Sequence, residues 1–244
     1  MDTLEIALLL FSALAGASSV PPPAPVPWRG SSIDSFHTYV LTDRLYRDGK
    51  AREGKVEDYA RMDDGWIALT FNNESVFRYN PDMRLLRSDL VQFFQMPAGG
   101  RLLFMASIKR DSPDFYDARV YQVFFTELKM FEVYVDASDA SAPRWIFRVQ
   151  REERWSRPLE PGRGCNFGVL CDGAAGTVSL FFSEDDEPLE LSSVSGVSAT
   201  IESKPEVHWG PLIYDAGGAT LEHSETFMYS GVGVTDRLAL RGSP

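Results

Sequence analysis

The stretch Arg119-Val-Tyr-Gln-Val-Phe-Phe-Thr-Glu-Leu128, followed closely by Phe131-Glu-Val-Tyr-Val135, decides the fold class. Both segments are rich in β-branched and aromatic residues, and the second alternates apolar with polar residues, which is typical of a strand with one buried face. Turn sequences such as Asp63-Asp-Gly separate similar runs elsewhere. We expect further strands at residues 66–71, 102–108, 145–149, 166–171, 177–182, 207–214 and 227–234.

The spacing of these runs points to one all-β domain. No long window has a 3.6-residue apolar period, although residues 83–94 are compatible with a short helix. Strands that recur every 8–14 residues or so favour a single-domain sandwich of antiparallel strands of the jelly-roll type. No internal repeat or mid-chain linker interrupts the pattern, so we expect one domain over residues 28–240.

The N-terminus carries a separate signal. The apolar run at residues 6–16 is shorter than the roughly 20 residues that span a bilayer, and small residues follow it at Ala15, Ala17 and Ser19. This pattern predicts a signal peptide over residues 1–19. The alternative, an N-terminal core helix, fits poorly with the Pro-rich linker at 20–27. We therefore expect a secreted, extracellular protein that does not associate with membranes.

The composition excludes several classes. The chain has 244 residues, and 44% of them are hydrophobic, a composition typical of a globular rather than a disordered protein. A net charge of −11 argues against nucleic acid as a partner. With two Cys and three His, and with no phosphate loop or zinc motif, we expect no cofactor and no metal. The acidic run Glu184–Glu187 lacks EF-hand spacing and is interpreted as a turn.

The two cysteines give a test of the strand prediction. Cys165 and Cys171 are six residues apart. In a strand their Cα atoms would be roughly 20 Å apart at about 3.3 Å per residue, whereas a disulfide needs less than about 7 Å. We predict that they are not bridged and that Cys171 packs on the same strand face as Phe167 and Val169.

Three polar residues next to or inside apolar runs are candidates for chemistry. Glu127 ends a strand run, Asp89 follows Arg87-Ser88, and His208 stands beside an aromatic residue. A carboxylate on a sandwich face is suited to acid or base work on a glycosidic bond, since burial raises its pKa. Each also has a structural interpretation: Glu127 as a solvated strand residue, Asp89 as a partner of Arg87 or Arg84, and His208 as a hydrogen-bonded core residue.

Several blocks, in order, resemble glycoside hydrolase family 131, the secreted fungal β-glucanases with a β-jelly-roll fold. The resemblance spans roughly residues 28–236. It rests on Ile67-Ala-Leu-Thr-Phe-Asn-Asn-Glu-Ser-Val-Phe77, Arg87-Ser-Asp-Leu90, Leu102-Leu-Phe-Met-Ala-Ser-Ile108, Tyr121-Gln-Val-Phe-Phe-Thr-Glu127, Asn166-Phe-Gly-Val-Leu-Cys-Asp172, Thr177-Val-Ser-Leu-Phe-Phe-Ser183, Val207-His-Trp-Gly-Pro-Leu212 and Glu225-Thr-Phe-Met-Tyr-Ser-Gly231.

The resemblance implies a concave carbohydrate-binding cleft that contains Asp89, Glu127 and His208 as catalytic residues. We expect Asp89 and Glu127 to be the acid/base pair and His208 to orient or tune one of them. The same blocks suggest three substrate-binding residues, which are Arg87, Gln122 and Trp209. Asp89 departs from the family, which has Glu there; the shorter side chain moves the carboxyl by about 1.5 Å, enough to impair proton transfer.

The leading hypothesis is a secreted glycoside hydrolase acting on β-1,3-, β-1,4- or β-1,6-linked glucan, a polysaccharide partner. Two alternatives stay open. One is a glucan-binding, lectin-like protein on the same fold with weakened catalysis, motivated by Asp89. The other is a polysaccharide lyase, which needs a uronate substrate and positive charge to neutralise its carboxylate.

Overall fold

The computed structural model describes residues 40, 42–45, 52–80, 83–110, 112, 119–214, 221 and 223–236. The predicted signal peptide (1–19) and linker (20–27) lie outside the described residues. A 3-10 helix, η2 (Val56–Asp58), is the single helical element of the described part. None of its segments forms a helix long and apolar enough to cross a membrane.

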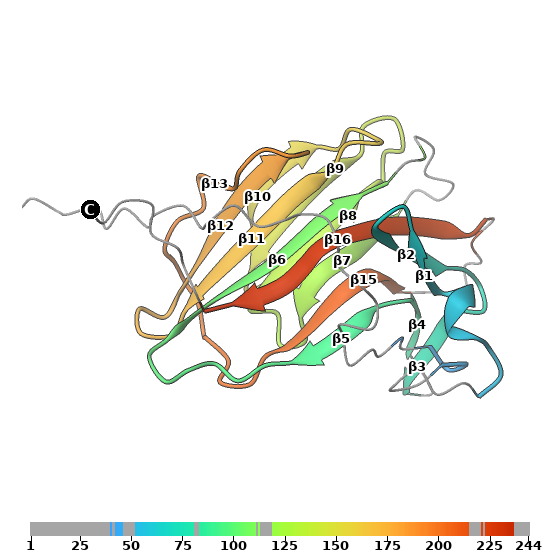
Figure 1. Ribbon diagram of the computed structural model, residues 1–244, viewed down its shortest axis with the longest axis horizontal. Coiled ribbons are helices and arrows are strands. Elements are labelled where there is room, and N and C mark those ends of the chain that lie inside the picture. The colour runs from blue at the N-terminus through green and yellow to red at the C-terminus, as the bar shows by residue number, and fades with distance from the viewer. Residues whose placement is uncertain are drawn as a thin grey trace, which may run out of the picture.

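Two eight-stranded sheets make up the domain, and every strand pair is antiparallel (Figure 1). The first sheet has the order β1 (Ala60–Asp63), β2 (Trp66–Phe71), β16 (Glu225–Thr235), β6 (Arg101–Lys109), β11 (Cys165–Asp172), β12 (Thr177–Glu184) and β13 (Glu190–Leu191), with β14 (Val197–Ser198) also paired to β12. The second has the order β10 (Glu152–Pro158), β9 (Arg144–Val149), β8 (Phe131–Asp136), β7 (Val120–Thr126), β15 (Glu206–Tyr214), β4 (Met83–Arg87) and β3 (Val76–Asn80), with β5 (Leu90–Phe93) also paired to β15.

The predicted all-β jelly-roll sandwich is confirmed, as is each strand predicted from the apolar runs. The short helix considered for residues 83–94 is wrong. That segment forms β4 and β5, which both pair with β15 and leave residues 88–89 between them. The pairing with a distant strand overrides the local pattern, as is common for short apolar runs.

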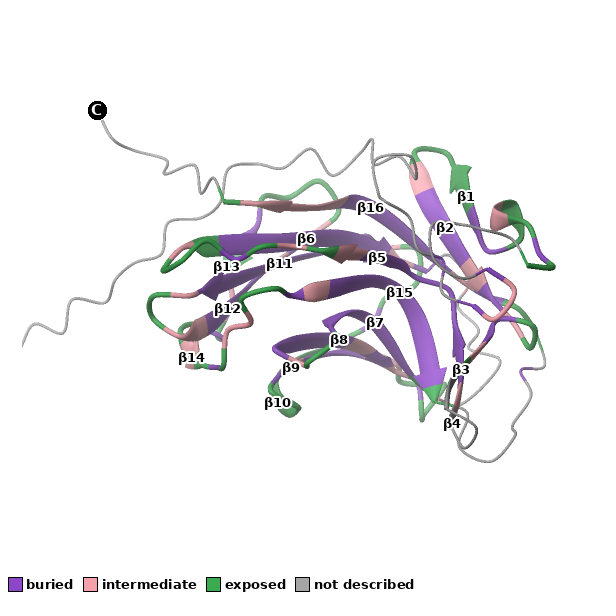
Figure 2. Cartoon of the chain, turned by 90° about the horizontal axis from the view of Figure 1, so that it is seen from below, coloured by how far each residue is buried: buried purple, intermediate pink, exposed green. Residues whose placement is uncertain are grey.

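The core lies between the two sheets, whose inner strand residues are mostly buried (Figure 2). Large rings fill it, and two of them also tie the layers together by hydrogen bonds. The indole Nε1 of Trp209, on β15, donates to the Met105 carbonyl on β6 over 3.1 Å. The hydroxyl of Tyr229, on β16, donates to the Val123 carbonyl on β7 over 3.0 Å. The buried polar atoms of these two aromatic residues are thereby satisfied across the sandwich.

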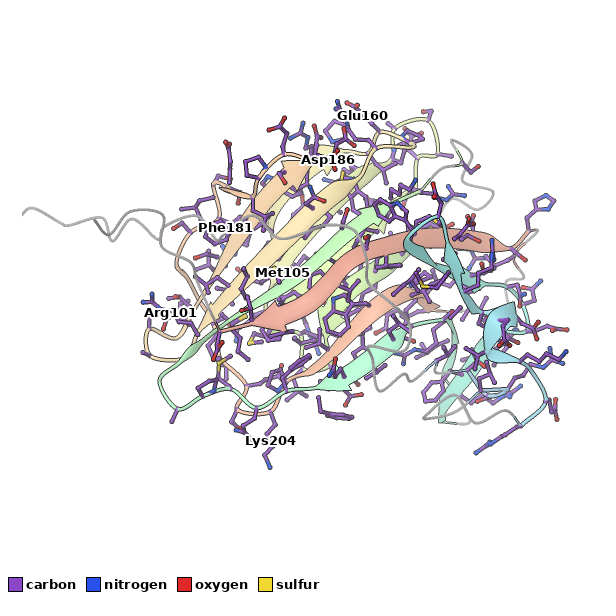
Figure 3. The ribbon with its side chains drawn as sticks, in the orientation of Figure 1. Arg101, Met105, Glu160, Phe181, Asp186 and Lys204 are labelled. Atoms are coloured by element: carbon purple, nitrogen blue, oxygen red, sulfur yellow. The ribbon has the colours of Figure 1, made fainter. Side chains whose placement is uncertain are left out.

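The cysteine-bearing strand matches its prediction. Residues 165–172 form β11, all of them buried, and both Cys165 and Cys171 are free thiols. Cys171 belongs to the main core cluster together with Phe167 and Val169. Leu170 points to the other face of the sheet, where it joins a smaller apolar cluster that includes Met105 and Phe181. Figure 3 labels the latter two residues.

Candidate active site

Strand β15 carries the candidate residues His208 and Trp209. Because adjacent strand residues face opposite sides, these two lie on different faces of the sheet. His208 pairs with Phe125 of β7 on the face turned away from the core, where their rings stack in parallel with centroids 4.5 Å apart. Trp209 points the other way, is fully buried and stacks on the core residue Phe124. The expectation that Trp209 contacts a substrate is therefore wrong. Adjacent strand residues face opposite sides, so the Trp209 ring fills the core.

Asp89 reaches His208 because β15 contains a glycine at the right place. Gly210 has φ +152°, a conformation that side chains rarely adopt, and lies opposite the turn between β4 and β5. A Cβ on Gly210 would come within 2.3 Å of the Ser88 carbonyl oxygen and 2.4 Å of the Asp89 Cα. The missing side chain thus lets residues 88–89 approach β15 closely.

Arg87, Asp89 and His208 form a compact buried cluster. The Arg87 Nε donates to the Asp89 Oδ1 over 2.7 Å, and the Arg87 Nη2 pairs with Oδ2. The His208 Nδ1 lies 2.7 Å from the same Oδ2 and 2.9 Å from the Arg87 Nη2. Because a guanidinium only donates and a carboxylate only accepts, the Nδ1 proton belongs on the Asp89 side. One carboxylate therefore holds two cationic groups in place.

These contacts set the charges of the cluster. Burial raises the pKa of the Asp89 carboxyl, but the Arg87 charge and the hydrogen bonds from His208 and Arg87 outweigh it and hold this pKa below its usual range. Burial likewise lowers the pKa of His208, yet its contacts with Asp89, Glu127 and Glu206 raise it to about 9. At neutral pH, His208 is therefore a buried imidazolium and Asp89 a buried carboxylate.

The other imidazole nitrogen faces two further carboxylates. The His208 Nε2 lies 3.4 Å from the Glu127 Oε2 and 3.5 Å from the Glu206 Oε1. Neither contact is a well-aligned hydrogen bond, so the attraction is that of an ion pair. The His208 and Asp89 side chains are 1% and 0% exposed, whereas those of Glu127 and Glu206 are 45% and 30% exposed. Only the two glutamates are open to a substrate.

His208 is also the main reason why the pKa of Glu127 is lowered. Its contact lowers the pKa of the Glu127 carboxyl, burial opposes this, and the charges of Lys129 and Arg87 add to the lowering. The Lys129 ammonium lies 4.2 Å from the centre of the Phe125 ring, which stacks on His208. Glu127 thus has the charge state of a base or nucleophile at neutral pH.

A polar network continues from this cluster along the same face. The Gln122 Nε2 donates to the Glu132 Oε1 over 2.9 Å, and the Tyr134 hydroxyl donates to the same oxygen over 2.7 Å. The Lys129 Nζ donates to the Gln122 Oε1 over 3.3 Å. Next to the network is a cavity of about 490 Å³ lined in part by Gln122, Tyr134 and Arg148. The geometry provides polar groups beside a cavity, as a sugar subsite requires.

The structure brings Arg87, Asp89, Glu127 and His208 together and places Gln122 in the adjoining network. Sequence reasoning missed Glu206. It stands two residues before His208 in an alternating strand, so the period of two places both on one face. Lys129 and Glu132 were also missed. They join the site through the turn and hairpin after β7, a pairing that the spacing of two residues does not reveal.

No cluster of His, Cys, Asp and Glu within the described ranges has an arrangement suited to a metal ion. The acidic segment Glu184–Glu187 includes a turn at residues 185–186, as interpreted from the sequence. Its charges are bound by arginines: Arg157 and Arg163 lie 2.8 and 3.1 Å from the two carboxylate oxygens of Glu184.

The class of the protein follows from its match to a known protein family. Residues 28–238 match the model of the glycoside hydrolase 131 catalytic N-terminal domain. The chain therefore belongs to glycoside hydrolase family 131. A search of curated proteins gave no significant match.

Solved structures agree on the fold. A GH131 β-glucanase catalytic domain from Podospora anserina has a TM-score of 0.60 at 20% identity, with 91% of this chain and 89% of that chain covered. The catalytic domain of the glycoside hydrolase family 131 protein from Coprinopsis cinerea has a TM-score of 0.64 at 23% identity, with 87% and 94% covered. An alginate lyase of polysaccharide lyase family 7 also shares the fold, with a TM-score of 0.52 at 10% identity and coverage of 82% and 93%.

Proposed function

We propose that this protein hydrolyses β-glucan and that Glu127 is the ionised catalytic carboxylate. The observation that carries the proposal is the chain of contacts from Asp89 through His208 to Glu127, which ends at a partly exposed carboxylate. Family membership and the β-glucanase named among the structural relatives support glucan as the substrate. We also propose export, on the basis of the apolar N-terminal run followed by small residues.

Asp89 has a different role in this proposal from the membership of the acid/base pair that the sequence resemblance implies. Its carboxylate is fully buried, and both of its oxygens are engaged by Arg87 and His208. A group in that position does not touch a substrate. Asp89 is instead a positioning residue that keeps His208 charged and oriented, in the way that a buried carboxylate orients a catalytic imidazole in other hydrolases.

A glucan-binding protein without catalysis is the second candidate. The enclosure of Asp89 favours it, because the position that the family fills with Glu holds a shorter carboxylate locked in an ion pair. The same exposed glutamates and the cavity beside Gln122 would then serve binding alone.

Products from polymer substrates separate these functions. The purified protein is incubated with laminarin, with mixed-linkage β-1,3/1,4-glucan, with a β-1,6-glucan and with a uronate polymer, and new reducing ends are measured together with ultraviolet absorbance. Reducing ends without ultraviolet absorbance support hydrolysis. Binding to the polymer with no reducing ends supports the second candidate, and absorbing unsaturated products from a uronate polymer would indicate a lyase.

A further inference from the structure

Three carboxylates surround His208, and two of them reach solvent. Asp89 holds Nδ1 from within the protein, while Glu127 and Glu206 flank Nε2 from the outside. Hydrolysis of a glycoside by carboxyl groups requires two that meet the substrate, one ionised and one protonated. Since Asp89 is enclosed, the second carboxyl has to come from elsewhere in the site.

Glu206 is held at a fixed place relative to Glu127. The backbone N–H of Glu127 donates to the Glu206 carbonyl over 2.9 Å, and the neighbouring residues Val207 and Thr126 are strand partners. Both carboxyls lie within 3.5 Å of one nitrogen, so their nearest oxygens are at most about 7 Å apart. The two carboxyls are therefore no farther apart than the limit of about 9.5 Å for a pair that acts on one glycosidic bond.

His208 is fixed so that its free edge points at these two groups. Stacking on Phe125 and the contact of Nδ1 with Asp89 define the plane and direction of the ring. The buried Nε2 makes no aligned hydrogen bond with the described residues, although it lies between Glu127 and Glu206. A buried cationic nitrogen that points between two partly exposed carboxyl groups indicates an organised site.

The charges around the two glutamates differ. Glu127 is stabilised as a carboxylate by His208, Lys129 and Arg87. Glu206 instead has a further acid, Glu202, close by, and the negative charges of Glu127 and Glu206 add to burial in raising the pKa of Glu202. Glu127 is therefore the ionised member of the pair, which leaves the role of the acid to the other partly exposed carboxyl, that of Glu206.

We infer that Glu206 is the general acid of the reaction, paired with the ionised Glu127 across His208. The inference rests on the proposed function. The carboxyl proton of Glu206 passes to the glycosidic oxygen as the bond from that oxygen to the anomeric carbon breaks. Water then supplies the hydroxyl group of the anomeric carbon, and its remaining proton restores the acid form of Glu206. Glu206 is in this account a catalytic residue, and Asp89 is not.

The test compares Glu206→Gln with Glu127→Gln on two substrates of different leaving group. General acid catalysis contributes about 10²–10⁴-fold, so Glu206→Gln should lose at least 100-fold in kcat on laminarin or mixed-linkage glucan. On a 2,4-dinitrophenyl β-glycoside of a glucose disaccharide, whose leaving group needs no proton, the loss should be below about tenfold. Glu127→Gln should lose activity on both substrates.

Controls separate the possible failures. Glu202→Gln tests the neighbouring acid, and Glu190→Gln is a matched change at an exposed residue of β13 in the other sheet. Thermal unfolding of each variant identifies any that does not fold. Three results would overturn the inference while hydrolysis stands. Glu206→Gln could keep its activity on the polymer, or it could lose activity equally on both substrates. Alternatively, Glu202→Gln could show the substrate-dependent loss expected of Glu206→Gln. If the wild type cleaves no glucan, the proposed function fails, and the assignment of Glu206 fails with it.

Discussion

The Asp89 Oδ2 and the His208 Nδ1 lie 2.7 Å apart in a position closed to solvent, although 119 residues separate them in the chain. The contact explains why two ionised groups are stable inside the protein. Each supplies the counter-charge that the other lost on leaving water, and Arg87 completes the balance. The site is therefore sensitive to anything that changes the charge of either residue.

Stability should fall as the pH rises through the titration of His208. The folded-state pKa of about 9 is above the usual value of 6.5, so the stabilisation is fully present below pH 6.5 and is lost as the pH rises through about 9. The loss should be on the order of 3 kcal/mol. Urea unfolding at pH 6.0 and pH 9.5 measures it. Gln carries no charge that titrates, so the His208→Gln variant should show a much smaller difference; an equal difference would contradict the assignment.

Asp89→Asn should abolish most activity without affecting substrate binding. The change keeps the shape of the side chain but leaves the Arg87 charge buried without its partner, which typically costs about 3–5 kcal/mol of stability. Because Asp89 does not touch the substrate, kcat should fall at least tenfold while KM stays within about twofold. Asp63→Asn is the control, since Arg61 and Asp63 form the same i, i+2 pair on an exposed strand. A rise in KM at unchanged kcat would show that Asp89 binds substrate instead.

Gly210→Ala should damage both fold and site. The added Cβ meets backbone atoms of residues 88 and 89 and also requires a strained φ. We expect a loss of more than about 2 kcal/mol in the free energy of unfolding, along with the loss of activity. Gly65→Ala has a similar positive-φ cost but open space around it, so it should lose only about 1 kcal/mol. Similar losses in the two variants would mean that the close approach at Asp89 is unimportant.

The two thiols should be unreactive in the folded protein. Burial raises the pKa of Cys165 to about 12 and that of Cys171 well above its usual range. A thiol-disulfide reagent should therefore label neither in native conditions and both after denaturation without reductant. Labelling of neither thiol after denaturation would reveal a disulfide and contradict the strand geometry of β11.

Much of the fold follows from sequence because strands with one buried face have a period of two. That period marked β8 directly, whereas β7 and β11 were predicted from short apolar runs. The same period holds the information that Trp209 faces the core when His208 does not. The expected role of Trp209 ignored this alternation. Glu206 was equally accessible to the same reasoning, since it shares a face with His208.

The environment of Asp89 was beyond local sequence reasoning. Its burial depends on β4 and β5 both pairing with β15 and on the absence of a side chain at Gly210. These contacts join segments more than 100 residues apart, and the local pattern of residues 83–94 suggested a helix. Sequence therefore identified the members of the cluster, while only the structure separates those open to a substrate from those enclosed.

The most direct test of the account is glucan hydrolysis by the wild type and by Glu127→Gln, with Glu190→Gln as the matched control. Reducing-end release from laminarin and mixed-linkage glucan is measured at equal concentrations of folded protein. The account predicts release by the wild type and by Glu190→Gln, and a loss of at least 100-fold in Glu127→Gln. Release by Glu127→Gln at the wild-type rate, or none by the wild type, would contradict it.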